Sequence, residues 1–128
     1  MLISYGRHSI DKTDIKSVSK ALKSNFLTQG SLVKKFEILL KKKLHTKYAT
    51  VVNSGSSALL LVGKILKWKK GDLVAVPPIT FLSSVNTVEH CGAKPVFVDI
   101  NMEDYCMDPK KLETILEKDK YKKIKAAI

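Results

Sequence analysis

Five small and uncharged polar residues, Asn53-Ser54-Gly55-Ser56-Ser57, stand between a β-branched stretch and an apolar stretch. Serine hydroxyls and backbone amides at the start of a helix can donate hydrogen bonds, and the helix dipole favours an anion there. Gly55 would allow the backbone to approach a ligand closely. These residue types therefore indicate an anion site for a group such as phosphate. They are equally typical of a loop that only caps a helix, and the motif alone leaves both interpretations open.

The loop differs from the two best-known phosphate motifs. It lacks the lysine of a P-loop and the glycine spacing of a dinucleotide-binding fingerprint. Nucleoside triphosphates and NAD are therefore poor candidates for its ligand.

A second loop, Pro77-Pro78-Ile79-Thr80-Phe81, also follows a strand-like stretch and precedes a helix-like one. Its Phe81 could be a core residue, as most phenylalanines are, or a ring that stacks on a ligand. Loops that leave the carboxyl ends of parallel strands share one edge of the sheet. If both loops do so, they combine a phosphate cradle with a stacking platform, as a phosphorylated aromatic cofactor requires.

The spacing of apolar residues predicts the elements that must position these loops. Two helices are expected over 9–25 and 31–44. Strands are expected over 48–52, 73–76, 94–98 and 123–128, with helices over 57–68, 80–91 and 109–118 between them. The helix over 57–68 is apolar almost all round and is predicted to be buried. Strands that alternate with helices predict an α/β fold with a mostly parallel sheet.

The composition limits the partners and the location of the protein. The net charge is +11 over 128 residues, but Arg7 is the only arginine, whereas nucleic-acid surfaces usually depend on arginine. Lysines 16, 20, 23, 34, 35 and 41 are predicted to be dispersed and exposed on helix faces. The sequence shows no signal peptide and no membrane span, and its two cysteines are too far apart for a metal knuckle. We therefore expect a cytoplasmic protein with reduced thiols and no metal site.

Several segments, taken in order, resemble the DegT-type nucleotide-sugar aminotransferases. The matching segments are Asp14-Ile15, Leu27-Thr28-Gln29-Gly30, Val33 to Glu37 ("V-x-x-F-E"), Asn53 to Leu59 ("N-S-G-T-x-A-L"), Gly71-Asp72 ("G-D-E-V"), Pro77 to Phe81 ("P-x-x-T-F") and Gly92 to Ile100 ("G-A-x-P-V-F-V-D-I"). Each motif is weak alone, but their shared order and spacing across the chain make the resemblance specific.

The resemblance implies the fold and the cofactor. The chain would be the N-terminal part of the mostly parallel-sheet large domain of a type I aminotransferase that uses pyridoxal 5'-phosphate (PLP), preceded by two helices. Residues 1–46 would form an N-terminal helical segment, and residues 47–128 would begin the PLP-binding α/β domain, which would be incomplete in this chain.

The resemblance also assigns roles to single residues. Ser56, Ser57 and the amide of Gly55 would bind the PLP phosphate, and the ring of Phe81 would stack on the pyridine. Asn86 is a further cofactor-binding candidate, although it could equally be a polar residue on a helix surface.

The segment Thr28-Gln29-Gly30 stands where members of this family approach the substrate or the partner subunit, and it could equally be only a turn between helices. The family's Schiff-base lysine and the acidic partner of the pyridine nitrogen are expected beyond Ile128. No catalytic residue is therefore assigned in this chain, and the 128 residues alone are predicted to be inactive.

The activity implied by the resemblance is transfer of an amino group, with glutamate as the donor, to a keto sugar attached to a nucleotide. Such enzymes serve amino-sugar and surface polysaccharide biosynthesis and usually form homodimers. The stretch "F-L-T-Q-G" resembles most those members that aminate carbon four of UDP-linked deoxy sugars, including the pseudaminic acid pathway. Two alternatives stay open: a non-catalytic or regulatory relative on the same fold, and a basic nucleic-acid-binding domain.

Overall fold

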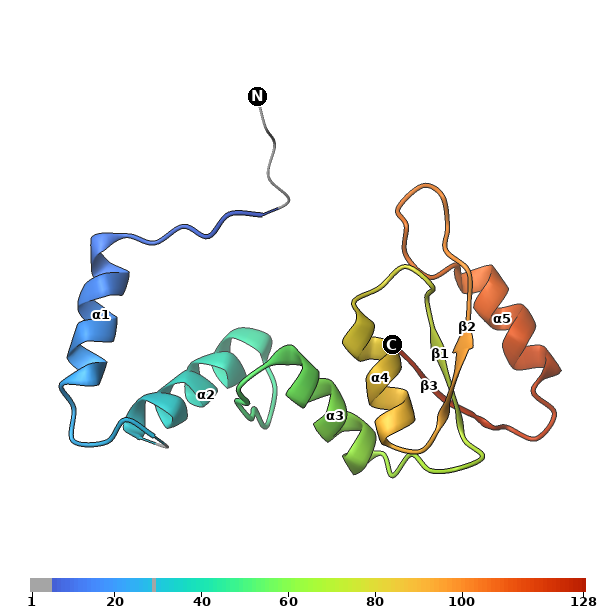
Figure 1. Ribbon diagram of the computed structural model, residues 1–128, viewed down its shortest axis with the longest axis horizontal. Helices are drawn as coiled ribbons and strands as arrows, with labels where there is room; N and C mark the ends of the chain where they lie inside the picture. Colours follow the sequence, from blue (N-terminus) through green and yellow to red (C-terminus); the bar gives the residue numbers. More distant parts are fainter. Residues whose placement is uncertain (1–5, 29) are drawn as a thin grey trace. The chain divides into compact units, whose positions relative to one another are not determined.

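The computed structural model describes residues 6–28 and 30–128 and consists of two compact units (Figure 1). The first unit ends at Val51, and the second begins at Val52. The first contains the two helices that precede the glycine- and serine-rich loop, and the second contains the sheet and both candidate loops.

The N-terminal unit contains α1 (Lys12–Leu22) and α2 (Ser31–Leu44). Helix α1 is shorter than the predicted 9–25 because Asp11 caps its start, accepting from the amides of Thr13 and Asp14, and forms a capping box with the Asp14 side chain. At the other end, the Ser24 hydroxyl donates to the Ala21 carbonyl at 2.7 Å, which satisfies one carbonyl of the last turn. The predicted bounds of α2 are confirmed.

The strand predicted over 48–52 is wrong, because this stretch has no regular secondary structure. Its one long-range hydrogen bond runs from the Val51 amide to Oε1 of Glu37 in α2, at 3.1 Å. The β-branched residues favour an extended backbone, but a strand also requires a neighbouring strand to accept its hydrogen bonds. No described strand provides these acceptors.

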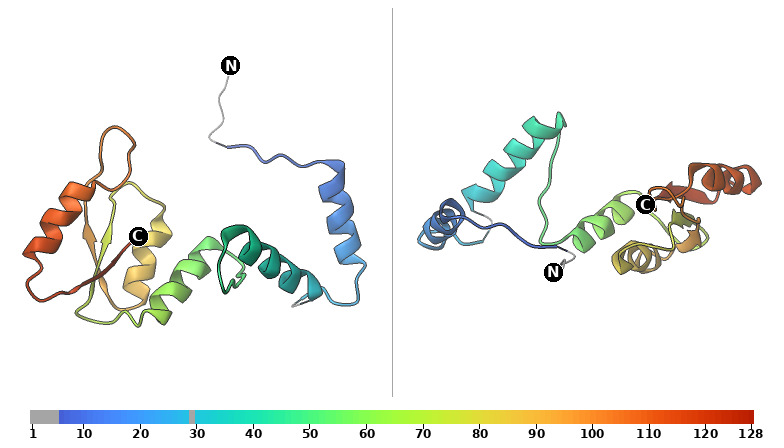
Figure 2. Two further views of the ribbon diagram at one scale, coloured as in Figure 1. Left: turned by 180° about the vertical axis from the view of Figure 1, so that it is seen from behind. Right: turned by 90° about the horizontal axis from the view of Figure 1, so that it is seen from above.

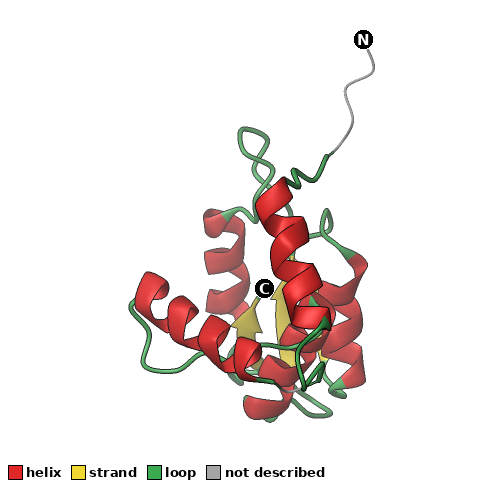
Figure 3. Cartoon of the chain, turned by 90° about the vertical axis from the view of Figure 1, so that its left-hand side faces the viewer, coloured by secondary structure: helices red, strands yellow, loops and turns green. Residues whose placement is uncertain are grey.

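The second unit is built on a three-stranded parallel sheet in the order β2-β1-β3, as the alternating pattern predicts. Figure 3 draws the strands of this sheet in yellow, among the helices. Its strands are β1 (Leu73–Val76), β2 (Lys94–Phe97) and β3 (Ile124–Ala127). Because β1 is central, Val74, Ala75 and Val76 are fully buried. The two outer strands are only partly covered.

Three helices accompany the sheet: α3 (Gly55–Ile65), α4 (Leu82–His90) and α5 (Pro109–Lys118). Helices α4 and α5 lie on opposite sides of the sheet, and α3 packs against α4 (Figures 1 and 2). Helix α5 has the predicted bounds, with Asp108 as its cap. Helix α4 is shorter than the predicted 80–91. Helix α3 begins two residues before the predicted Ser57 and ends before Trp68.

The buried core gathers Trp68, Val74, Val76, Val88, Cys91 and Ala93. Gly63 is the buried residue of α3, and a Cβ atom there would lie 2.7 Å from Sγ of Cys91 and 2.8 Å from the Trp68 ring. A glycine at this position therefore allows α3 to approach the core closely.

The prediction that the helix over 57–68 is buried is wrong for most of α3, in which Gly63 is the buried residue. Leu61, Val62 and Ile65 of α3 are 40%, 48% and 67% exposed. Helix α3 packs along α4, and these three side chains are left exposed. An apolar composition shows that a helix can be buried, but it does not supply the surface that would bury it.

The connection between β2 and α5 is held at its base by an ion pair. Lys111 Nζ lies 2.8 Å from Oδ2 of Asp99 and also donates to the Ile100 carbonyl at 3.4 Å. The hydrogen bond and charge of Lys111, with the Ile100 amide, lower the pKa of the Asp99 carboxyl below its ordinary value, and the Asp99 side chain raises the pKa of Lys111.

Candidate functional site

The serine-rich loop enters α3 through a cap at Ser54. Its hydroxyl oxygen accepts from the amide of Ser57 at 3.1 Å and donates to the Ser57 hydroxyl oxygen at 3.0 Å. The first bond within the helix joins the Ala58 amide to the Ser54 carbonyl. Within the described residues, the amides of Gly55 and Ser56 donate to no protein atom. The loop therefore caps its helix and still keeps donors free for a ligand.

A pocket of about 400 Å³ lies between the first turns of α3 and the length of α4, from Phe81 to His90. Ser56 and Ser57 contribute from α3, and Leu82 and Ser83 contribute from α4. The start of α4 has no side-chain cap. Two helix N-termini thus line one pocket, and each favours negative charge through its unpaired amides and its dipole.

Phe81 stands at the entrance to α4 and lines the same pocket. Its side chain is 76% exposed. The interpretation of Phe81 as a core residue is therefore wrong, and the ring is available to cover the face of a ligand.

The space around Gly55 suits the close approach of an anion. A Cβ atom at this position would meet no atom within 4 Å. Gly55 itself is not among the residues that line the pocket, and it directly precedes Ser56, which is. Two free amides, the Ser56 and Ser57 hydroxyls and an exposed ring together fit a phosphorylated aromatic group.

The two loops come together by a different route from the one that the sequence indicates. The loop ending at Phe81 does follow the carboxyl end of β1, as predicted. The loop before α3 follows no strand, because 48–52 is irregular. The packing of α3 against α4 brings its serines to the pocket instead.

Comparison with known proteins identifies the family. The model of the DegT/DnrJ/EryC1/StrS aminotransferase family matches residues 8–128. The chain belongs to this family.

Relatives in the DegT family include sugar aminotransferases of known name. The chain is 40% identical over 118 residues to the UDP-4-amino-4,6-dideoxy-N-acetyl-β-L-altrosamine transaminase of Campylobacter jejuni, covering 92% of this chain and 31% of that protein. It is 39% identical to the spore coat polysaccharide biosynthesis protein SpsC of Bacillus subtilis, covering 87% and 28%.

A solved structure also supports the fold. The putative sugar aminotransferase Spr1654 of Streptococcus pneumoniae, in its PLP form, matches with a TM-score of 0.80 and 33% identity, covering 88% of this chain and 29% of that one. The α/β fold of a PLP-dependent sugar aminotransferase is therefore confirmed. The chain spans about three-tenths of the length of these relatives.

The DegT family motifs locate four of the nine residues that line the pocket. Ser56, Ser57, Phe81 and Asn86 line it together, and Asn86 is exposed one turn beyond the start of α4. Sequence reasoning missed the other residues of the lining, which are Leu60, Leu82, Ser83, Thr87 and His90. Their signal was the helical spacing along α4, where Ser83, Thr87 and His90 follow each other at intervals of three or four residues.

The segment predicted to contact substrate or a partner subunit lies in the N-terminal unit. Thr28 is exposed, and Gly30 is the half-buried N-cap of α2. Gln29 lies outside the described residues. At Gly30 a Cβ atom would lie 3.0 Å from the Phe26 carbonyl oxygen, so a tight turn accounts for this glycine.

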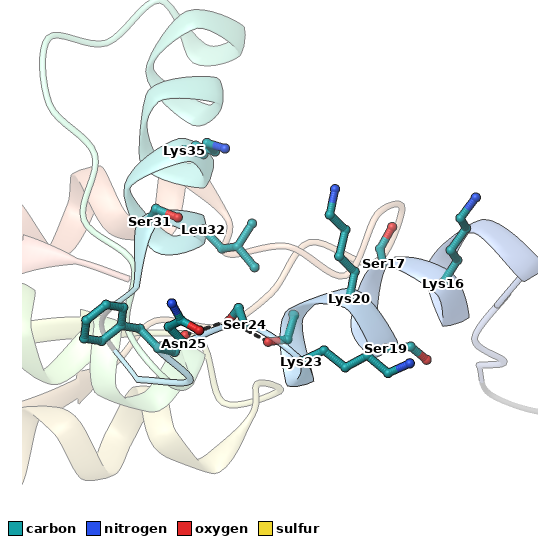
Figure 4. A pocket seen from close by; sticks show the side chains of 12 residues that line it. Lys16, Ser17, Ser19, Lys20, Lys23, Ser24, Asn25, Ser31, Leu32 and Lys35 are labelled. Carbon is teal, nitrogen blue, oxygen red and sulfur yellow. Dashed lines mark hydrogen bonds between the residues drawn. The ribbon is translucent and has the colours of Figure 1, made fainter.

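The lysines of the N-terminal unit are exposed but less dispersed than predicted. Of the six named above, only Lys41 is half-buried. Lys16, Lys20, Lys23 and Lys35 all line one pocket between α1 and α2, into which Figure 4 shows side chains from both helices reaching. Phe26 is the one aromatic residue in its lining. The pocket therefore lacks the series of rings on which single-stranded nucleic acids stack.

Three further features concern predicted chemistry and location. Cys91 is buried and Cys106 is exposed, and both are free thiols. Among the described residues, no three histidine, cysteine or acidic side chains gather as metal ligands. None of the helices in the described ranges combines the length and apolarity needed to cross a bilayer.

Proposed function

We propose that the protein carrying this chain is a PLP-dependent aminotransferase that transfers an amino group from glutamate to a keto sugar attached to a nucleotide. The observation that carries the proposal is the pocket between α3 and α4, which is lined by hydroxyls, by the starts of two helices with free amides, and by an exposed ring. The membership of the DegT family and the names of the relatives support it.

Different residues at this site would bind different parts of the cofactor. Ser56 and Ser57 would hold the phosphate together with the amide of Gly55, which precedes them at the start of α3, the Phe81 ring would cover one face of the pyridine, and Asn86 would contact the cofactor from α4. The phosphate gains from charge-assisted hydrogen bonds, each contributing about 1.5–3 kcal/mol, and from the α3 N-terminus.

PLP, when bound, supplies an electron sink for the carbon that carries the amino group. The residues of this chain contribute orientation. They fix the phosphate at one end of the pocket and exclude water from one face of the ring. The lysine that would hold and move the proton is proposed to lie beyond Ile128, so the chain contributes part of the site.

The remaining assignments follow from the family. We assign residues 1–46, which include α1 and α2, to a segment that precedes the cofactor-binding domain beginning at residue 47. We assign Thr28, Gln29 and Gly30 to the substrate or to the partner subunit of a homodimer in the cytoplasm. The apolar stripe of α1, formed by Ile15, Val18 and Leu22, is about 60% exposed in this chain and suits burial in such a dimer.

Turnover of a UDP-linked 4-keto deoxy sugar with glutamate and PLP tests the proposal in the full-length protein. We expect formation of the amino sugar together with 2-oxoglutarate, and no turnover by residues 1–128 alone. A full-length protein that binds PLP without any turnover of keto sugars would instead be the non-catalytic relative. Turnover by residues 1–128 would contradict the placement of the lysine beyond Ile128.

A further inference from the structure

The hydroxyl of Ser54 has no hydrogen left to donate to a phosphate, although it stands beside the residues proposed to bind the phosphate. Its oxygen accepts from the Ser57 amide, and its hydrogen is donated to the Ser57 hydroxyl oxygen. Ser57 receives that bond at its oxygen, so its own hydrogen stays available. Ser57 also lines the pocket, whereas Ser54 does not belong to the lining.

We propose that Ser54 is a positioning residue that acts on the cofactor phosphate through Ser57. Because the Ser57 oxygen already accepts the hydrogen bond from Ser54, the hydrogen of the Ser57 hydroxyl is free to point toward the pocket. A hydroxyl that accepts one hydrogen bond also donates a stronger one. The inference rests on the proposed PLP site and assigns to Ser54 a role that capping alone does not include.

The cap and the positioning role can be separated by the choice of substitution. Glycine at an N-cap costs only a few tenths of a kcal/mol relative to serine, so Ser54→Gly removes the hydroxyl while the helix stays in place. Ser54→Thr keeps a hydroxyl at the same position and serves as the matched control.

The experiment measures the dissociation constants of PLP and of pyridoxal, which lacks the phosphate, in the full-length protein. The variants are Ser54→Gly, Ser54→Thr, Ser57→Ala and the double variant Ser54→Gly/Ser57→Ala. We expect Ser57→Ala to weaken PLP binding about tenfold and Ser54→Gly about threefold. The double variant should bind as weakly as Ser57→Ala alone, because Ser54 then has no hydroxyl to orient. Ser54→Thr should bind like the wild type.

Pyridoxal distinguishes this role from a general loosening of the loop. Its affinity should change little in Ser54→Gly, since the proposed effect is directed at the phosphate. Equal weakening of PLP and pyridoxal, or fully multiplicative effects of the two substitutions, would overturn the role of Ser54 while leaving the PLP site intact. A wild-type protein that does not prefer PLP to pyridoxal would refute the phosphate site itself.

Discussion

The two units of the chain contain similar amphipathic sequences but differ in what covers them. In the unit that begins at Val52, the sheet and α4 enclose a core in which Val74, Val76 and Val88 are fully buried. In the unit that ends at Val51, neither helix has a buried residue. Helix α1 is instead defined by local interactions, above all by its capping box at Asp11.

This difference shows which part of the stability each kind of signal provides. Caps and propensities fix where a helix starts and stops, and each contributes about 1 kcal/mol. Burial of apolar side chains contributes far more and holds elements to one another. The candidate site belongs to the unit with the core, so its donors are held by packing as well as by a cap.

The largest effect is expected when a charge is placed in the core. Val88→Asp should destabilise the unit that begins at Val52 by about 4 kcal/mol or more, because the carboxylate would be buried without a partner. Val18→Asp, at a position 60% exposed in α1, should change the stability of the 128-residue chain by less than about 0.5 kcal/mol.

Urea unfolding measures both variants. Trp68 is the only tryptophan and lies in the core, so its fluorescence reports the α/β unit, while circular dichroism reports all helices. Equal losses of stability in the two variants would show that α1 is packed as firmly as α4, and the contrast between the units would be lost.

The sequence predicts the elements that local signals delimit, and it fails where a feature depends on contacts with other elements. Helix α2, helix α5 and strand β1 have the expected bounds, because each is delimited by local signals such as Asp108-Pro109 at the start of α5. The strand over 48–52 failed because strand formation depends on a partner strand that local sequence does not specify. The exposure of α3 was missed for the same reason, since burial depends on other elements.

Two glycines of α3 give the next largest contrast. Gly63→Ala should destabilise the α/β unit by about 1–2 kcal/mol, because its Cβ would lie 2.7 Å from Sγ of Cys91 and the gain in helix propensity offsets only part of the overpacking. Gly55→Ala has open space around its Cβ, so it should change stability by less than about 0.5 kcal/mol.

For PLP binding, substitutions at Gly55 are expected to have the larger effect, in contrast to their small effect on stability. Gly55→Ala, and more strongly Gly55→Val, should weaken PLP binding in the full-length protein because the side chain would occupy the approach to the backbone. Thermal melts and PLP titrations of the same variants separate the two effects. A Gly55→Val protein with wild-type affinity for PLP would remove Gly55 from the proposed site.

Two serines of the loop give a smaller and complementary pair of effects. Ser54→Ala should lower stability by about 1 kcal/mol, because the amide of Ser57 loses its acceptor. Ser56→Ala should leave the melting temperature unchanged, since its side chain makes no hydrogen bond within the described residues, and should weaken PLP binding about tenfold. Loss of stability without loss of affinity in Ser56→Ala would reduce this residue to a structural role.

The sequence predicted residues that share a pocket, but it did not predict how their loop is held. Ser56, Ser57, Phe81 and Asn86 were found from motif positions and lie around one pocket. It could not choose the cap among several small polar residues, because only the backbone geometry shows that the Ser54 oxygen reaches the Ser57 amide. His90 was missed although its spacing from Thr87 places both residues on one face of α4, because only the packing of α3 against α4 shows that this face lines a pocket.

The smallest effects concern two exposed carboxyl groups, one in each unit. The Lys111 ammonium, with the Ile100 amide, lowers the pKa of Asp99, and the amides of Asp14 and Thr13 lower the pKa of Asp11. The unfolded carboxyl has the higher pKa in both cases, so each contribution to stability is present above about pH 3.8 and is lost as the pH falls through the folded value. Lys111 has a raised pKa, so the Asp99 pair is also lost as the pH rises beyond 10.5 and through the folded value.

Carbon-detected NMR titration of the carboxyl groups tests this difference between a side-chain partner and a helix cap. Lys111→Met should raise the pKa of Asp99 toward 3.8, while the bond from the Ile100 amide keeps it below that value. The pKa of Asp11 should not change, since its partners are backbone amides of its own helix. Added salt should raise the pKa of Asp99 in the wild type, because salt screens an exposed ion pair. An Asp99 titration that is the same in Lys111→Met and in the wild type would show that the ion pair does not hold the base of the β2–α5 connection in solution.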